Sequence, residues 1–239
     1  MLTLQNIVLA IQTIIGIVIG LIVFFSKYNK ADKSSIEEYV KEQNVQRIQF
    51  KDNILLFSGS ENKSALVFYP GGNIEYNAYE PLMAACAKRG IMSILVKMPL
   101  NKAIFNLNIA KKIKQYFPEI KTWYIGGHSV GRAIASMHVG KYPNEYAGLI
   151  LLASYSNKDL SKTNLKVLSI YGSKDIIMNK KSYNKYKKNL PKDFTEYIIE
   201  DGIHRYFGMY GFPKNLPFTK ISNVEQIELT ADKIEEFVN

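Results

Sequence analysis

The fold is decided by residues 123–137, which read WYIGGHSVGRAIASM. The apolar run at 123–125 predicts a buried strand, and the apolar spacing from Val130 onward predicts a helix. Between them, residues 127–131 (GHSVG) match the pattern G-x-S-x-G. When a strand precedes this pattern and a helix follows it, the pattern predicts a sharp turn that exposes the hydroxyl of its serine, here Ser129.

The residue types around Ser129 suit such a turn. The positions two before and two after a serine in a strained turn must be small, and they are Gly127 and Gly131. The following helix would direct its unpaired amides and its positive dipole end toward the serine. The amide of Val130 could then donate to an oxyanion. A bare G-x-S-x-G also occurs by chance, so the rest of the chain must supply a base, an acid and a second donor.

The composition is that of an ordinary globular protein. The chain has 239 residues, of which 47% are hydrophobic and 22% charged, so it can form one medium domain with an appendage. Its single cysteine, Cys86, excludes an internal disulfide framework and a multi-cysteine zinc site. We expect Cys86 to be a core residue, and we expect neither a metal nor an organic cofactor.

The N-terminal segment is strongly apolar. Residues 7–25 form an almost unbroken apolar run that is long enough to span a bilayer as a helix. A cleaved signal peptide is the alternative, but no Lys or Arg precedes the run and no clear cleavage site follows it. Three lysines follow it, at positions 27, 30 and 33. We therefore predict an uncleaved transmembrane anchor, with the membrane as a partner and the main domain on the cytoplasmic side.

The formal net charge of +10 must be carried by the part of the chain that follows the anchor. Lysines are densest between Lys174 and Lys192, where a solvated helix face is the simplest interpretation. A basic surface against anionic lipid is a second interpretation. Because no nucleic-acid recognition motif accompanies the charge, we expect no nucleic-acid partner.

The order of predicted elements defines the fold class. We divide the chain into an anchor (1–26), a polar linker or short helix (27–44) and one domain (45–239). The domain begins with a predicted antiparallel hairpin, 45–50 and 54–57, on either side of a turn signal. Predicted strands then follow at 65–69, 91–96, 123–125, 149–152, 167–171 and 195–199, and predicted helices at 79–89, 104–117, 130–142, 182–190 and 224–238. This alternation predicts an α/β domain with a mostly parallel, doubly wound sheet, whose reactive groups lie at the carboxyl ends of the strands.

Candidates for a base and an acid follow predicted strands. The chain has three histidines. His128 adjoins Ser129 in a tight turn, where neighbouring side chains point apart, and His138 lies well inside a predicted helix. Only His204 comes late enough for the order Ser, Asp, His. Asp175, after the strand at 167–171, best suits the acid, although it could instead cap a helix. The competing acidic residues are Asp159, Asp193, Glu200 and Asp201.

A second oxyanion donor is expected in the loop at residues 70–73, PGGN, after the strand at 65–69. Its glycines would let the backbone approach a substrate closely. Either Gly72 or Asn73 could supply the amide, and a plain tight turn is the alternative.

Several linked motifs resemble those of the α/β-hydrolase fold superfamily, and more narrowly a compact, lid-less, membrane-anchored bacterial branch of it. These motifs are YPGG at 69–72, VKMPLN at 96–101, GHSVGR at 127–132, LASY at 152–155, SIYGSKD at 169–175 and GIHRYFGMYG at 202–211. The resemblance implies that Ser129 is a nucleophile, Asp175 the acid and His204 the base, acting on a small-molecule acyl substrate through an acyl-enzyme.

Two residues depart from the family pattern. Arg132 stands where a small residue is usual, and it either points to solvent or meets an anionic substrate. Ile203 stands where Asn is frequent. The alternative to a hydrolase is a membrane-tethered binding protein that keeps the fold without the chemistry.

Overall fold

The computed structural model describes residues 3–26, 28–98, 108–211 and 217–239, and its centre is a sheet of eight strands. In chain order the strands are β1 (Gln46–Lys51), β2 (Ile54–Ser58), β3 (Ser64–Tyr69), β4 (Ile91–Val96), β5 (Trp123–His128), β6 (Gly148–Leu152), β7 (Lys166–Gly172) and β8 (Phe194–Ile199). Their order in the sheet is β1-β2-β4-β3-β5-β6-β7-β8. The pairs β1–β2 and β2–β4 are antiparallel, and all other pairs are parallel. The predicted mostly parallel sheet with an antiparallel hairpin at its start is therefore confirmed.

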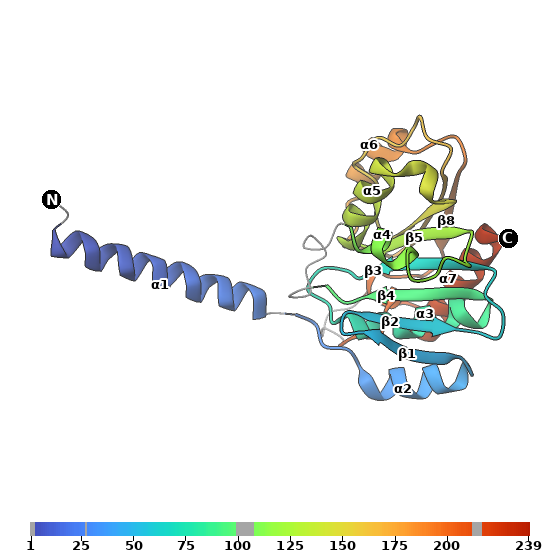
Figure 1. Ribbon diagram of the computed structural model, residues 1–239, viewed down its shortest axis with the longest axis horizontal. Coiled ribbons are helices and arrows are strands. Elements are labelled where there is room, and N and C mark those ends of the chain that lie inside the picture. Colours follow the sequence, from blue (N-terminus) through green and yellow to red (C-terminus); the bar gives the residue numbers. More distant parts are fainter. Residues whose placement is uncertain (1–2, 27, 99–107, 212–216) are drawn as a thin grey trace.

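Helices cover both faces of this sheet (Figure 1). The helices α2 (Lys33–Glu42), α3 (Glu80–Lys88) and α7 (Asn223–Val238) contribute buried residues to the core on one face. The helices α4 (Ile109–Lys114) and α5 (Gly131–Lys141) contribute to the core on the other face. The remaining helix of the domain is α6 (Lys180–Tyr186), and the described short 3₁₀ turns are η1 (Tyr76–Tyr79), η4 (Pro143–Glu145), η5 (Lys187–Asn189) and η6 (His204–Phe207). The doubly wound architecture expected from the sequence is thus present.

The central strands read as continuous apolar runs because both of their faces are covered. Every residue of β3 is buried. Successive side chains of a strand point to opposite faces, so Leu66 and Phe68 join one core while Ala65 and Val67 join the other. The burial of both sets explains why no polar alternation marks this strand in the sequence.

The N-terminal helix α1 comprises Leu4–Ser26 and extends away from the sheet in Figure 1. Over the parts of the chain that the structure describes, no helix combines the length and the apolar content needed to cross a membrane. The predicted transmembrane helix is therefore not supported. The cytoplasmic location and the membrane partner stay predictions.

The segment after α1 is paired with loops of the domain through backbone hydrogen bonds. Asn29 forms a parallel bridge with Ile74, and Ala31 forms an antiparallel bridge with Tyr210. The helix α2 then buries Ile36, Tyr39 and Val40 in the core on the side of α3. The stretch interpreted from its sequence as a polar linker or short helix is therefore bound to the domain from Asn29 onward.

Two predictions fall partly outside the described residues. The helix predicted over 104–117 is described only from residue 108, where α4 follows. The motif at 96–101 is described only as far as residue 98.

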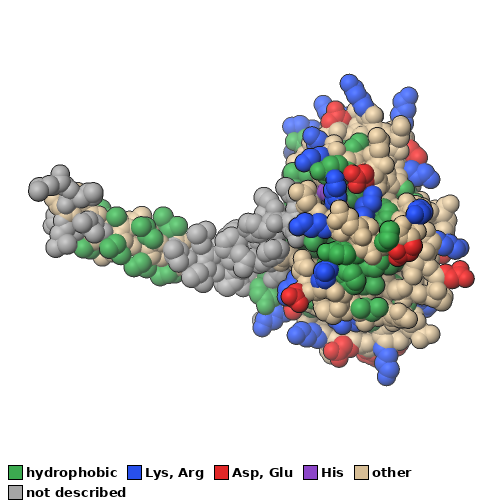
Figure 2. Space-filling view, in the orientation of Figure 1, with side chains coloured by type: hydrophobic (Ala, Val, Ile, Leu, Met, Phe, Trp, Pro, Cys, Tyr) green, Lys and Arg blue, Asp and Glu red, His purple; other side chains and the backbone are tan. Residues whose placement is uncertain are grey.

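The lysines of α6 and η5 are exposed, and Lys and Arg side chains are spread over the face seen in Figure 2.

Candidate active site

The turn around Ser129 has the backbone geometry that the G-x-S-x-G pattern predicts. The strand β5 ends at His128, α5 begins at Gly131, and Ser129 between them has a φ of 50°. The left-handed conformation costs a residue with a side chain about 1–2 kcal/mol. A hydrogen bond from the Ser129 amide to the Leu152 carbonyl oxygen, 3.0 Å long, holds the turn against β6.

Steric contact with the backbone explains both glycines of the pattern. A Cβ atom on Gly127 would lie 2.6 Å from the carbonyl carbon of Gly131. A Cβ atom on Gly131 would lie 2.3 Å from the carbonyl oxygen of Tyr69, at the end of β3. Neither neighbour is a flexible side chain, so any larger residue would push α5 away from the sheet.

The acid and base candidates meet at the carboxyl ends of β7 and β8. Nδ1 of His204 lies 2.8 Å from Oδ2 of Asp175, and both side chains are buried. The other carboxylate oxygen, Oδ1, accepts hydrogen bonds of 2.8 Å from the amides of Ile177 and Met178. Asp175 therefore fills both roles considered for it, because one oxygen binds the imidazole and the other caps the following turn.

None of the four competing acidic residues, all of them described, is bonded to His204. Asp159 accepts from Ser161, Glu200 accepts from Ser173, and Asp201 pairs with Lys174. The fourth, Asp193, uses its carbonyl oxygen to bind the amide of Val167.

The Asp175 contact determines the tautomer of His204. A carboxylate only accepts hydrogen bonds, so Nδ1 of His204 carries the proton and donates it. Nε2 of the neutral ring is then free of a proton and can accept one from a nucleophile. No hydrogen bond joins Ser129 to His204, both of which are described. Such bonds are often long without substrate and tighten when it binds.

The histidine beside Ser129 has a different environment. His128 is fully buried, and burial, followed by its neighbour His204, lowers its pKa well below the usual value. Nε2 of His128 donates to the His204 carbonyl oxygen at 3.1 Å, so Nδ1 accepts from the Tyr79 hydroxyl at 2.7 Å. The Tyr79 oxygen in turn accepts from the Gly71 amide at 3.1 Å. This series of hydrogen bonds runs from the 70–73 loop, through His128 in the turn at residues 127–131, to the loop that carries His204.

These hydrogen bonds reduce the number of amides in the 70–73 loop that could donate to an oxyanion. The Gly71 amide is already used by Tyr79. Gly72 faces Val130, because a Cβ atom placed on it would lie 3.4 Å from the Val130 Cβ. Neither the Gly72 amide nor the Val130 amide donates to a described acceptor. Asn73 has a φ of 57°, and its carbonyl oxygen accepts from the Asn29 amide at 2.8 Å. Gly72 and Val130 therefore lie close together, and the amides of both remain candidate oxyanion donors.

Sequence reasoning did not find Tyr79 as a member of this site. It lies 49 positions from His128, within a stretch predicted as an ordinary helix. No local pattern distinguishes it from the other tyrosines that pack in a core, and only its contacts reveal the role.

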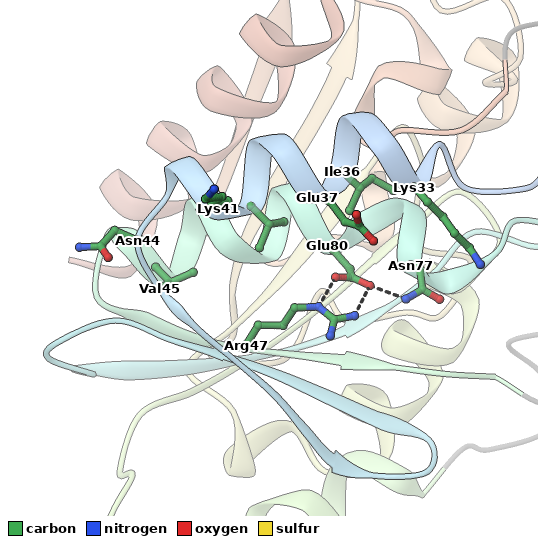
Figure 3. Close-up of a pocket in the computed structure, with 10 residues that line it drawn as sticks. Lys33, Ile36, Glu37, Lys41, Asn44, Val45, Arg47, Asn77 and Glu80 are labelled. Atoms are coloured by element: carbon green, nitrogen blue, oxygen red, sulfur yellow. Dashed lines mark hydrogen bonds and ion pairs between the residues drawn. The ribbon is translucent and has the colours of Figure 1, made fainter.

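A pocket of about 630 Å³ lies elsewhere, between α2 and the start of β1 (Figure 3). At its floor, Arg47 binds Glu80 through two bonds of 2.6 and 2.9 Å, and Asn77 donates to the same carboxylate. Arg47, Glu80 and Asn77 are therefore hydrogen-bonded to one another, and none of Ser129, Asp175 and His204 lines the pocket. Among the described residues, no three His, Cys, Asp or Glu side chains are grouped so as to hold a metal ion.

The comparisons with known proteins agree with this architecture. Residues 65–228 match the alpha/beta hydrolase family, and because that is more than half of the chain, the protein belongs to this family. No curated protein matches the chain in sequence.

Two solved structures share the fold. One is a proposed lipase, lip1, of Acinetobacter baumannii AYE, with 15% identity, a TM-score of 0.58, and coverage of 86% of this chain and 94% of that one. The other is a predicted CIB-like hydrolase of Thermoplasma acidophilum, with 16% identity, a TM-score of 0.54, and coverage of 80% and 98%. The family match supports a hydrolase of the alpha/beta family, and the two solved structures show that the fold is shared.

Proposed function

We propose that the protein is a serine hydrolase that cleaves a carboxylic ester, or a related thioester or amide, through Ser129, Asp175 and His204. The observation that carries the proposal is the 2.8 Å contact between Nδ1 of His204 and Oδ2 of Asp175. It leaves Nε2 of the imidazole as a base at the same edge of the sheet as the strained Ser129.

The reaction takes place in two acyl transfers. Nε2 of His204 removes the proton of the Ser129 hydroxyl as that oxygen attacks the acyl carbon, and Asp175 stabilises the resulting imidazolium. The amide of Val130 and that of Gly72 or Asn73 stabilise the oxyanion. His204 then protonates the leaving group, and a water molecule, activated by the same imidazole, releases the acid from Ser129.

The surroundings of the site favour a substrate with an apolar part. Val130, next to the nucleophile, and Ile176 and Ile177, directly after the acid, are 55%, 77% and 57% exposed. The connection between β6 and β7, residues 153–165, is described throughout and contains no helix that could cover the site. We therefore propose an open site that binds an ester of modest size and with an apolar acyl part.

A fluorophosphonate probe tests the nucleophile, because it reacts only with an activated serine. We expect the full-length wild type to be labelled and Ser129→Ala not to be. Labelling of His204→Ala should fall by about 10²–10⁴-fold, the usual contribution of a general base. Glu200→Gln, which changes a nearby carboxylate that is not bonded to His204, should be labelled like wild type.

The alternative, a binding protein without activity, predicts the opposite result. It is favoured by the missing hydrogen bond between Ser129 and His204. A folded wild type that is not labelled and hydrolyses no nitrophenyl ester would establish that alternative.

A further inference from the structure

We propose that Arg132 makes this site selective for substrates that carry a negatively charged group close to the acyl bond that is cleaved. The inference rests on the proposed hydrolase function and names the substrate class within it. It starts from a residue that departs from the pattern of the family, where a small side chain is usual.

Arg132 reaches back toward the nucleophile. It lies in the first turn of α5, and its Nη1 donates to the carbonyl oxygen of Ser129 at 3.3 Å. The guanidinium therefore contacts the backbone of the residue whose hydroxyl is the proposed nucleophile. A cation at the N-terminal end of a helix is electrostatically unfavourable, because the helix dipole is positive there.

Two tyrosines hold the guanidinium in place. Its central carbon lies 3.9 Å from the centre of the Tyr155 ring, and that ring stacks on Tyr186 with a centre-to-centre distance of 5.3 Å and an angle of 5°. Stacking on an aromatic face orients the planar guanidinium. The side chain is therefore preorganised, and it loses little further freedom when it binds a ligand.

The charge of Arg132 has no counter-charge in this protein. It forms no ion pair with any described carboxylate, whereas the ion pairs of Arg47 and Arg89 are formed. The residues outside the described ranges contain no Asp or Glu. In addition, Nε of Arg132 is buried and has no described hydrogen-bond partner. Burial lowers the pKa of Arg132, and only the neighbouring Tyr155 opposes this effect.

An anionic group of the substrate would supply the missing partner. A carboxylate or phosphate accepts two parallel N–H donors of an arginine, and such charge-assisted bonds are the strong ones. In this proposal Arg132 only binds and orients the substrate and takes no part in bond making or breaking. Ser129 still forms the bond to the acyl carbon, the bond from that carbon to the leaving oxygen breaks, and His204 supplies the proton of the leaving alcohol. Together with the exposed Val130 and Ile176, this describes an amphipathic substrate.

Matched pairs of chromogenic esters test the selectivity on the full-length protein. In one pair, 4-nitrophenyl hexanoate and mono-4-nitrophenyl adipate, the acyl parts differ in a terminal carboxylate. In the other, 4-nitrophenyl butyrate and 3-carboxy-4-nitrophenyl butyrate, the charge lies on the leaving group. The quantity measured is the ratio of kcat/KM for the anionic ester to that for the neutral ester.

We expect Arg132→Gln to lower this ratio by about tenfold or more in at least one pair, the effect of losing one hydrogen bond to a charged group. Arg132→Lys, which keeps the charge but loses the fork and the stacking, should give an intermediate ratio. Lys112→Gln removes the same charge from an exposed position on α4 and should leave the ratio unchanged.

A fall of less than about threefold in both pairs for Arg132→Gln would overturn the inference, because an electrostatic contact beside the reacting bond must exceed that of a solvated surface charge. If the wild type is labelled by the fluorophosphonate and turns over both members of each pair, the proposed function survives that result. If the wild type is neither labelled nor active, both proposals fail. Should Arg132→Gln not fold, the ratio for Arg132→Lys is compared with that of the wild type. An equal ratio would overturn the inference.

Discussion

The proposed nucleophile and the proposed acid–base pair are held in place by different forces. Around Ser129 the turn depends on close backbone packing, with Gly127 against Gly131 and Gly131 against the end of β3. Around Asp175 and His204 the geometry depends on hydrogen bonds, three of which converge on a single carboxylate. The first region therefore tolerates no added volume, while the second tolerates no change in donors and acceptors.

The two histidines of the site show what this difference means for chemistry. Their rings are 4.6 Å apart. His204 donates to a carboxylate, which stabilises the protonated ring, whereas His128 lies between a tyrosine hydroxyl and a backbone carbonyl oxygen. Because only His204 has an anionic partner, only His204 is suited to take up a proton during a reaction.

The largest effect is expected from Asp175→Asn. The amides of Ile177 and Met178 would retain the side-chain oxygen, so the amide nitrogen would face His204 and favour the wrong tautomer. We expect kcat for a nitrophenyl ester to fall by about 10³–10⁴-fold. The unfolding midpoint in urea serves as the control for the fold. A loss below about tenfold, well under the range of general-base effects, would show that the carboxylate does not govern the base.

Gly131→Ala probes the sterically held region. The added methyl group would lie 2.3 Å from a backbone oxygen of β3, and we expect a loss of about 3 kcal/mol in unfolding free energy. Gly140→Ala is the matched control on the same helix. There the neighbour is the exposed side chain of Lys158, whose Cγ would lie 2.7 Å from the new methyl group and must move aside. The better helix propensity of Ala offsets this cost by up to about 1 kcal/mol, so we expect a much smaller loss than for Gly131→Ala. Equal effects in urea unfolding would contradict the distinction between the two regions.

Tyr79→Phe probes the hydrogen bonds that join the two regions. It would leave the Gly71 amide and Nδ1 of His128 without their partner, and an unsatisfied buried group costs about 1–3 kcal/mol. Tyr171→Phe is the control, because the Glu196 carboxylate that it leaves is still paired with Lys187. Chemical denaturation measures both. If the two variants lose the same stability, the chain through Tyr79 holds nothing in place.

The smallest effect is expected from the titration of His128. The unfolded state binds a proton near the ordinary pKa of about 6.5, while the buried ring in the folded state does not. Stability therefore falls as the pH drops below about 6.5, by at most about 1.4 kcal/mol per pH unit for this one group. His128→Asn should make the unfolding free energy less dependent on pH between about 5.5 and 7.5. An unchanged dependence would show that another group causes it.

The sequence by itself determined the elements and their order. Continuous apolar runs identified the buried strands, because a strand covered on both faces has apolar residues at every position. The G-x-S-x-G pattern located the turn at Ser129, because a strained turn leaves space only for small residues. The position of His204 late in the chain excluded the other two histidines as the base. The strands and the turn depend on neighbours within a few residues, so local physical chemistry is enough to read them, whereas the choice of His204 used the order of residues along the chain.

Only the tertiary structure decided which distant groups meet. It showed that Asp175, of five acidic candidates, is bonded to His204, that the Gly71 amide donates to Tyr79, and that the Arg132 guanidinium stacks on Tyr155. It also showed that Asn29 and Ala31 form bridges to Ile74 and Tyr210, and it did not support the predicted membrane span. Such contacts join residues that are between eight and more than a hundred positions apart, and a local sequence pattern does not predict them because they form only when the chain folds.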